Sequence, residues 1–98
     1  MGEQITSIER NPQAVDALTA WYELIVWNDD VNTFDWVIES LIEICHHTLE
    51  QATQCAYIIH FKGKYAVKKG SYELLHPMKD ALIDRGIQAT ISTCGDEI

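Results

Sequence analysis

Residues 27–34 read WNDDVNTF, and the rest of the chain is arranged around this short stretch. The residues before it, 22–27 (YELIVW), are rich in β-branched and aromatic side chains, which is typical of a β-strand. After it, apolar residues recur at steps of three and four, which predicts a helix with one apolar face; they are Phe34, Val37, Ile38, Leu41, Ile44 and Cys45. The stretch should therefore join a strand to a helix, and its Asn, Asp and Thr side chains suit the loose backbone amides of such a corner.

The whole chain predicts three short strands and three helices. The predicted elements are a strand over residues 22–27, helices over 33–47 and 49–60, a strand over 64–68, a helix over 71–86 and a strand over 87–92. Thr48 and Gln51 form the capping pattern that starts the second helix. Pro77 leaves two alternatives for the third, a kinked helix or a short turn followed by a helix that begins near Pro77. The order β-α-α-β-α-β favours an α+β fold of two layers, with a small antiparallel or mixed sheet and helices on one face.

Length and composition bound the possible functions. A chain of 98 residues, 47% of them hydrophobic, is enough for one domain, which we place at residues 21–93 between a mobile arm over 1–20 and a tail over 94–98. The formal net charge of −8 argues against nucleic acid as a partner and favours cationic ligands. We expect no signal peptide and no contact with a membrane, because no apolar run is long enough. Three cysteines without a Cys-x-x-Cys pair fit a cytoplasmic protein.

A second motif lies further along the chain. Residues 60–64 read HFKGK, so a histidine stands near the end of the second predicted helix, just before a Gly-Lys pair. The ordered combination of a strand, an Asn-Asp-Asp corner, two helices and this run resembles the ClpS family over residues 21–92. ClpS proteins are adaptors for the Clp AAA+ proteases and recognise the first residue of N-degron substrates. The resemblance implies a two-layer α/β fold, no enzymatic activity and no cofactor.

The resemblance also implies a binding site for the first residue of a polypeptide. Asn28, Asp29 and His60 match the family positions that bind the α-amino group, and together they offer three acceptors to the three donors of an ammonium group. The implied positions around the first side chain are Asn32, Phe34, Val37, Ala56, Ile59 and Ile87. The family accepts Leu, Phe, Tyr and Trp. Phe34 and Ala56 stand where many relatives carry Met, so the ranking among these four residues stays open.

A separate surface is implied for the partner unfoldase. Glu73, early in the third predicted helix, falls on a family contact position, and Lys79 lies one place beyond the position of the expected lysine. The implied partners are N-degron substrate proteins and the N-terminal domain of a ClpA- or ClpC-type unfoldase. We expect this chain to act as a monomer, and the identity of the unfoldase stays open.

Three other interpretations compete with this one. Cys and His are zinc ligands, but the spacing lacks the pairs of a zinc finger or ribbon, so we expect no metal and predict packed thiols and solvated imidazoles; the residues concerned are Cys45, His46, His47, Cys55 and His60. A nucleophilic Cys paired with His60 is disfavoured because Cys45 and Cys55 lie on or beside apolar helix faces. The third interpretation keeps the fold without the pocket, as a generic protein-docking module similar to the C-terminal domain of the ribosomal stalk protein.

Overall fold

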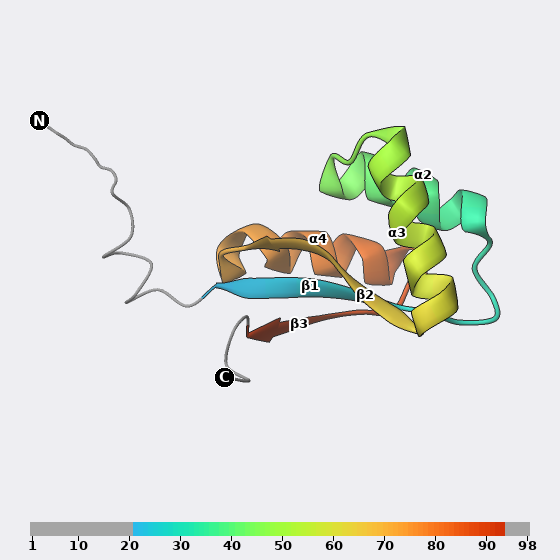
Figure 1. The fold of residues 1–98 in the computed structure, drawn as a ribbon. Coiled ribbons are helices and arrows are strands. Elements are labelled where there is room, and N and C mark those ends of the chain that lie inside the picture. Colours follow the sequence, from blue (N-terminus) through green and yellow to red (C-terminus); the bar gives the residue numbers. More distant parts are fainter. Residues whose placement is uncertain (1–20, 94–98) are drawn as a thin grey trace, which may run out of the picture.

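The computed structural model describes residues 21–93, so the arm predicted at 1–20 and the tail predicted at 94–98 lie outside the described residues. In chain order the elements are β1 (Tyr22–Trp27), α2 (Phe34–Cys45), α3 (Leu49–Lys62), β2 (Lys64–Gly70), α4 (Tyr72–Asp84) and β3 (Ala89–Thr93) (Figure 1). This order confirms the predicted β-α-α-β-α-β arrangement. No helix in the described part of the chain is long and apolar enough to cross a bilayer.

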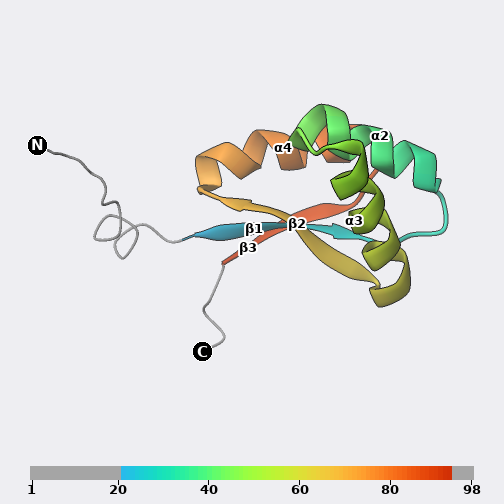
Figure 2. The same ribbon diagram turned by 45° about the horizontal axis from the view of Figure 1, so that its top comes forward.

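The three strands form one antiparallel sheet in the order β2-β1-β3. The first strand of the chain is therefore the middle strand, and the sheet is antiparallel rather than mixed. The register of β1 against β2 shifts between Leu24 and Ile25, where β2 carries one extra residue, Val67. All three helices lie on the same face of the sheet, which gives the two layers that the sequence predicted (Figures 1 and 2).

The hydrophobic core fills the space between the helices and the covered face of the sheet. Its largest fully buried apolar side chains are Leu24, Val26, Leu41, Cys45, Leu75, Leu82 and Ile87. Leu24 and Val26 alternate along β1 and point to the covered face, while Ile25 and Trp27 point to the other face and are only partly buried. Each buried leucine contributes about 1.5–3 kcal/mol through loss of water contact, so this core fixes the helices on β1.

Side-chain caps determine where the helices begin. Thr33, Thr48 and Ser71 each accept a hydrogen bond from the backbone N–H three residues later, and the Thr48 cap is the predicted capping box. The α2 helix ends two residues earlier than predicted because His46 adopts the left-handed conformation, with φ of 63°. The α4 helix runs unbroken through Pro77, which excludes the alternative of a separate turn before a shorter helix.

Two main-chain hydrogen bonds hold the end of β1 between other segments. The Trp27 N–H donates to the Gln88 carbonyl at 3.0 Å, and the Asn28 N–H donates to the Gly63 carbonyl at 2.9 Å. Gly63 ends α3 in a left-handed conformation, with φ of 94°. The second bond therefore joins the corner after β1 to the C-terminal end of α3, and brings together the two motifs that the sequence singled out.

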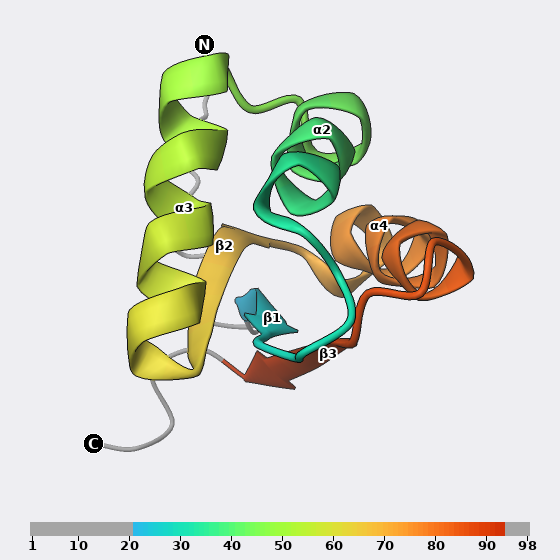
Figure 3. The same ribbon diagram turned by 90° about the vertical axis from the view of Figure 1, so that its right-hand side faces the viewer.

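The α2 helix is fixed on its other side to the turn between α4 and β3. The Trp36 Nε1–H donates to the Arg85 carbonyl at 3.0 Å. The Arg85 guanidinium in turn donates to Ser40 Oγ at 3.2 Å and pairs with the Glu43 carboxylate at 2.6 Å. Figure 3 shows the result, with α2 between α3 and α4 above the sheet.

Candidate functional site

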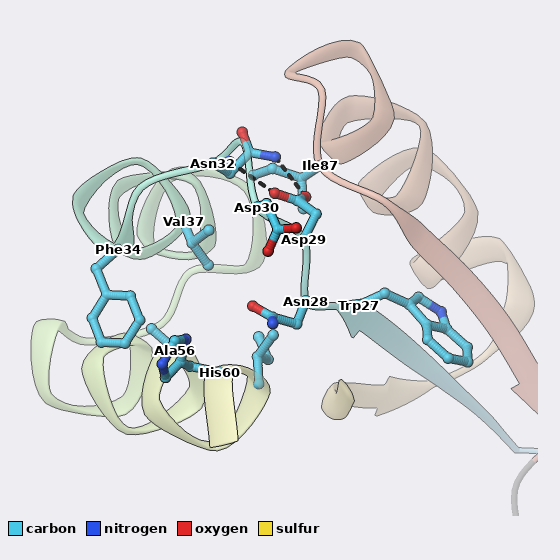
Figure 4. A pocket seen from close by; sticks show the side chains of 11 residues that line it. Trp27, Asn28, Asp29, Asp30, Asn32, Phe34, Val37, Ala56, His60 and Ile87 are labelled. Carbon is cyan, nitrogen blue, oxygen red and sulfur yellow. Dashed lines mark hydrogen bonds between the residues drawn. The ribbon is translucent and has the colours of Figure 1, made fainter. Parts of the chain in front are cut away.

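A cavity of about 280 Å³ lies where the corner after β1 meets the first turns of α2 and the second half of α3. Its lining consists of Trp27, Asn28, Asp29, Asp30, Asn32, Phe34, Val37, Ala56, Ile59, His60 and Ile87 (Figure 4). The structure thus brings together all nine residues that were predicted to bind the α-amino group or the first side chain. The other two, Trp27 and Asp30, were not predicted as site residues, although both belong to the stretch over residues 27–34.

The Asp29 carboxylate is held by the loop that follows it. Its Oδ1 accepts hydrogen bonds from the backbone N–H groups of Val31 and Asn32, both at 2.8 Å. Its Oδ2 accepts one from Asn32 Nδ2 at 2.8 Å, and Figure 4 shows Asn32 bonded to Asp29. Partial burial by itself raises the pKa of Asp29, but the hydrogen bonds from Asn32 and Val31 outweigh it, so the pKa lies below its usual value. The carboxylate is therefore negatively charged at neutral pH.

Asn32 has a structural role that the sequence analysis missed. Besides the bond to Asp29, its Nδ2 donates to the Gly86 carbonyl at 2.9 Å. Gly86 lies in the turn between α4 and β3, so one amide side chain joins the acidic corner to a turn far along the chain. Asn32 lines the cavity as predicted, and it also holds the Asp29 carboxylate in place.

Asn28 and His60 offer the other polar groups of the cavity. Both residues are exposed. Within residues 21–93, neither the Asn28 side-chain amide nor the His60 imidazole makes a hydrogen bond to another protein group. The His60 ring instead contacts the Phe34 ring edge to face, with the centroids 5.3 Å apart. The amide and the imidazole are thus open to a ligand, next to a carboxylate that is already charged.

The inner part of the cavity is apolar. Ala56, Ile59 and Ile87 are almost fully buried, with exposed fractions of 3%, 4% and 2%, and we call these three most buried lining residues its floor. Phe34 and Val37 are half-buried and complete the wall on the α2 side. An apolar floor below a polar mouth suits a ligand that is charged at one end and apolar at the other.

The two tryptophans near the site serve the fold more than the cavity. In Figure 4 the Trp27 indole points away from Phe34 and Val37, and its Nε1–H donates to Thr90 Oγ1 at 2.9 Å. Lys64 Nζ lies 4.8 Å from the centroid of the same ring. Trp36 packs against the core and is not part of the lining. Neither indole covers the cavity.

In the described part of the chain, the cysteines and histidines do not form a reactive site. Burial raises the pKa of Cys45 to about 11 and also raises that of Cys55, while it lowers the pKa of His47. Cys55 Sγ lies 3.9 Å from Nδ1 of His47, and His47 Nε2 bonds to the Val67 carbonyl at 2.9 Å. A neutral thiol beside a neutral imidazole is the opposite of an activated nucleophile. Within residues 21–93, no group of three or more His, Cys, Asp or Glu side chains is placed to bind a metal ion.

The prediction of packed thiols and solvated imidazoles is therefore confirmed only in part. Cys45 and Cys55 are buried, and His46 and His60 are exposed. His47 is half-buried and hydrogen-bonded, so the prediction is wrong for this residue.

The residues predicted to contact an unfoldase lie on α4, away from the cavity. Glu73 is exposed in the first turn, and Lys79 is half-buried with its Nζ 3.7 Å from the Asp80 carboxylate. Residues six apart on an α-helix point about 120° away from each other, so the two side chains do not share one face of α4.

The sheet, the helical layer and the cavity define a small α+β domain with a cavity between the corner after β1, α2 and α3. Residues 19–90 match the model of a family described as "ATP-dependent Clp protease adaptor protein ClpS". The chain belongs to the ClpS family, which confirms the resemblance found in the sequence. By this description the members are adaptors of a protease rather than enzymes.

Individual relatives agree with this assignment. The chain is 38% identical over 64 residues to a ClpS adapter protein of Acetivibrio thermocellus, covering 65% of this chain and 64% of that protein. It is 50% identical over 42 residues to one from Campylobacter jejuni, covering 43% and 44%, and 37% identical over 62 residues to one from Shewanella halifaxensis, covering 63% and 61%. The matched segments thus span between about two fifths and two thirds of these relatives.

Among solved structures, the fold is similar to one titled "The structure of Agrobacterium tumefaciens ClpS2 bound to L-phenylalaninamide". The TM-score is 0.67, and the match covers 76% of this chain and 96% of the other. The sequences are 15% identical over this match, so the similarity concerns the fold.

Proposed function

We propose that this protein is an adaptor that binds the free N-terminal residue of N-degron substrates and delivers them to a Clp AAA+ unfoldase for degradation. The preferred first residues would be the bulky hydrophobic ones, Leu, Phe, Tyr and Trp. One observation carries the proposal: one cavity joins an ionised carboxylate to a buried apolar floor, and its amide and imidazole have no hydrogen-bond partner among residues 21–93. An amino-terminal residue has the matching chemistry, because it is an ammonium group with an adjacent side chain.

The polar mouth accounts for recognition of the amine. Asp29 uses three of the roughly four lone-pair positions of its carboxylate on N–H groups of its own loop, so one remains for an ammonium donor. Asn28 and His60 supply two further acceptors. Acetylation would remove the positive charge and two donors, and hydrogen bonds to charged groups are worth about 1.5–3 kcal/mol each.

The apolar floor accounts for recognition of the side chain. A volume of about 280 Å³ is at the lower end of the range for ligand pockets, which fits one side chain rather than several residues. Burial of a Leu or Phe side chain contributes about 1.5–3 kcal/mol before ordering costs. The ligand of Agrobacterium tumefaciens ClpS2, L-phenylalaninamide, has the same two features, a free α-amine and a benzyl side chain.

Delivery to a cytoplasmic ClpA- or ClpC-type unfoldase is the second half of the proposal. It rests on the family description, which names a Clp protease as the partner. We assign Glu73, and Lys79 on a neighbouring face of α4, to this contact. No residue of α4 lines the cavity, so an adaptor could hold its substrate and its unfoldase at the same time.

Peptide titration tests the proposal directly. We expect a fluorescent Leu-first peptide to bind in the micromolar range, and its N-acetylated form and a Ser-first form to bind at least about tenfold more weakly. The variant Asp29→Asn should lose at least about tenfold in affinity for the Leu-first peptide. Asp35→Asn is the matched control, because Asp35 is an exposed acid in the first turn of α2 that does not line the cavity.

Equal binding of the free and acetylated peptides would refute the assignment and favour a generic docking module. Unchanged affinity in Asp29→Asn, with the fold intact by circular dichroism, would refute the role of Asp29 alone.

A further inference from the structure

Four aromatic rings form a continuous group beside the cavity. Phe34 contacts Tyr57 with ring centroids 5.1 Å apart, and contacts His60 at 5.3 Å. Phe61 completes the group, with its centroid 5.1 Å from His60 and 6.3 Å from Tyr57, whose ring lies nearly parallel. We call these four residues the aromatic cluster. Phe34 and His60 line the cavity and Tyr57 and Phe61 do not, so the cluster extends the site outward over α3.

The outer half of the cluster is not explained by the fold. Tyr57 and Phe61 are 50% and 75% exposed, and neither belongs to the hydrophobic core. The buried positions of α3 carry mostly small side chains; they are Ala52, Cys55, Ala56 and Ile59. On α3 the largest apolar side chains therefore face solvent, although burying them inside would stabilise the fold more. A contiguous exposed apolar patch is more often a binding site than the rest of a protein surface is.

We propose that the aromatic cluster is a second subsite, which binds a large apolar or aromatic side chain at the second or third position of the polypeptide whose first residue fills the cavity. This inference rests on the proposed function. Consecutive residues of an extended chain rise by about 3.3 Å, so the first and third side chains stand about 6.6 Å apart. The rings of Tyr57 and Phe61 lie 5.1 Å from rings that line the cavity, which is within this reach.

Continuity and charge both favour the bound polypeptide as the occupant. Phe34 and His60 belong to the cavity and to the aromatic cluster, so Tyr57 and Phe61 lie next to a chain that leaves the cavity on the α3 side. The surface assigned to the unfoldase lies on α4, on the other side of α2 (Figure 3). Asp29 and Asp30 at the mouth disfavour acidic side chains at these positions.

A peptide series on single variants tests the subsite. The peptides begin Leu-Ala-Ala, Leu-Phe-Ala, Leu-Ala-Phe or Leu-Glu-Glu, with an identical remainder. We expect wild-type protein to bind one or both Phe-containing peptides about three- to tenfold more tightly than Leu-Ala-Ala, and to bind Leu-Glu-Glu most weakly. We call the ratio of the affinity for a Phe-containing peptide to the affinity for Leu-Ala-Ala the advantage of Phe. Phe61→Ala and Tyr57→Ala should reduce this advantage to less than about twofold, while the affinity for Leu-Ala-Ala stays as in the wild type.

The matched control is Tyr72→Ala, which removes an aromatic ring of similar exposure, 47%, from α4. It should leave the advantage of Phe unchanged. Equal affinity for Leu-Ala-Ala and both Phe-containing peptides would overturn the subsite, as would an advantage that survives in the double variant Tyr57→Ala, Phe61→Ala. Acetylated Leu-Ala-Ala separates failure of the subsite from failure of the proposed function. If acetylation abolishes binding of Leu-Ala-Ala, the proposed function still stands although the subsite does not.

Discussion

Asp29 and Asn32 act as a pair, and the sequence predicted both as site residues but not the hydrogen bonds between them. Asp29 was assigned to amine binding because it matches a family position in the Asn-Asp-Asp corner and because a carboxylate suits an ammonium group. Asn32 was predicted only as part of the wall, since its bond to the Gly86 carbonyl could not be foreseen. That bond depends on how the turn after α4 packs against the corner, which no local sequence pattern contains.

The variant Asn32→Ala should therefore act through Asp29. It removes the Nδ2–H bonds to the Asp29 carboxylate and the Gly86 carbonyl. We expect the pKa of Asp29 to rise toward its usual value, and the free energy of unfolding to fall by about 1–2 kcal/mol. Carboxyl carbon NMR titration and urea denaturation measure the two effects. Asn28→Ala is the control, because it makes the same substitution at a side chain that does not bond to Asp29, and it should leave the Asp29 pKa and the free energy of unfolding unchanged. An unchanged Asp29 pKa in Asn32→Ala would contradict the pairing.

His47 should make the stability depend on pH. Burial lowers its pKa in the folded protein, although the bond to the Val67 carbonyl acts in the opposite direction. Below about pH 6.5, the usual histidine pKa, the unfolded chain then binds more protons than the folded one. The stabilisation is thus complete above about pH 6.5 and is lost as the pH falls through the folded pKa.

Urea midpoints between about pH 5 and about pH 7.5 measure this effect. His47→Gln should flatten the fall in stability at the acid end. His46→Asn is the control, because His46 is exposed and Asn tolerates the left-handed conformation at that position. If the pH dependence of stability persisted in His47→Gln and disappeared in His46→Asn, it would contradict the assignment to His47.

The elements could be predicted where their signals are local. Thr48 with Gln51 gave the start of α3, since a capping box lies within one helical turn. The backbone around Pro77 could not be predicted, because a kinked helix and a turn followed by a helix would bury the same apolar residues. The structure decides between them through packing: Leu75, Met78 and Leu82 on both sides of the proline are buried along one continuous α4.

An interior proline should make α4 less stable than it could be. Pro77 cannot donate the backbone hydrogen bond of its turn, and its ring crowds the preceding turn. We expect Pro77→Ala to raise the free energy of unfolding by about 1–2 kcal/mol, after subtracting the entropy that alanine adds to the unfolded chain. Urea denaturation measures this gain. A loss of stability would mean that the proline ring itself contributes packing that the substitution removes.

At the scale of the whole molecule, the sequence predicted two layers but not the details of the sheet. Short strands with alternating residues are compatible with antiparallel and mixed pairing, and the central place of β1 follows from the packing of the complete chain. Nine of the eleven residues that line the cavity were predicted through the family resemblance. The aromatic cluster beside it, with Tyr57 and Phe61, was not predicted, because exposed aromatic residues on a helix carry no signal until their neighbours are known.

The charge of the whole molecule should influence how fast substrates arrive. A net charge of −8 attracts basic peptides over distances comparable with the screening length. We expect a Leu-first peptide with three lysines beyond its fourth residue to associate at least about fivefold faster at 20 mM than at 500 mM salt, and a neutral peptide to change by less than about twofold. Stopped-flow fluorescence measures both rates. Equal salt dependence of the two peptides would rule out steering by the protein's charge.

The bond between the Asn28 N–H and the Gly63 carbonyl has a consequence for protein engineering. It uses main-chain atoms only, so any amino acid except proline at position 28 can keep it. At position 28 the backbone of the corner is thus independent of the side chain, whereas the Asp29 carboxylate itself holds the loop. Randomising positions 28 and 60, with Asp29 kept, offers a route to receptors for blocked termini, such as formylated or pyroglutamyl chains, without redesigning the backbone.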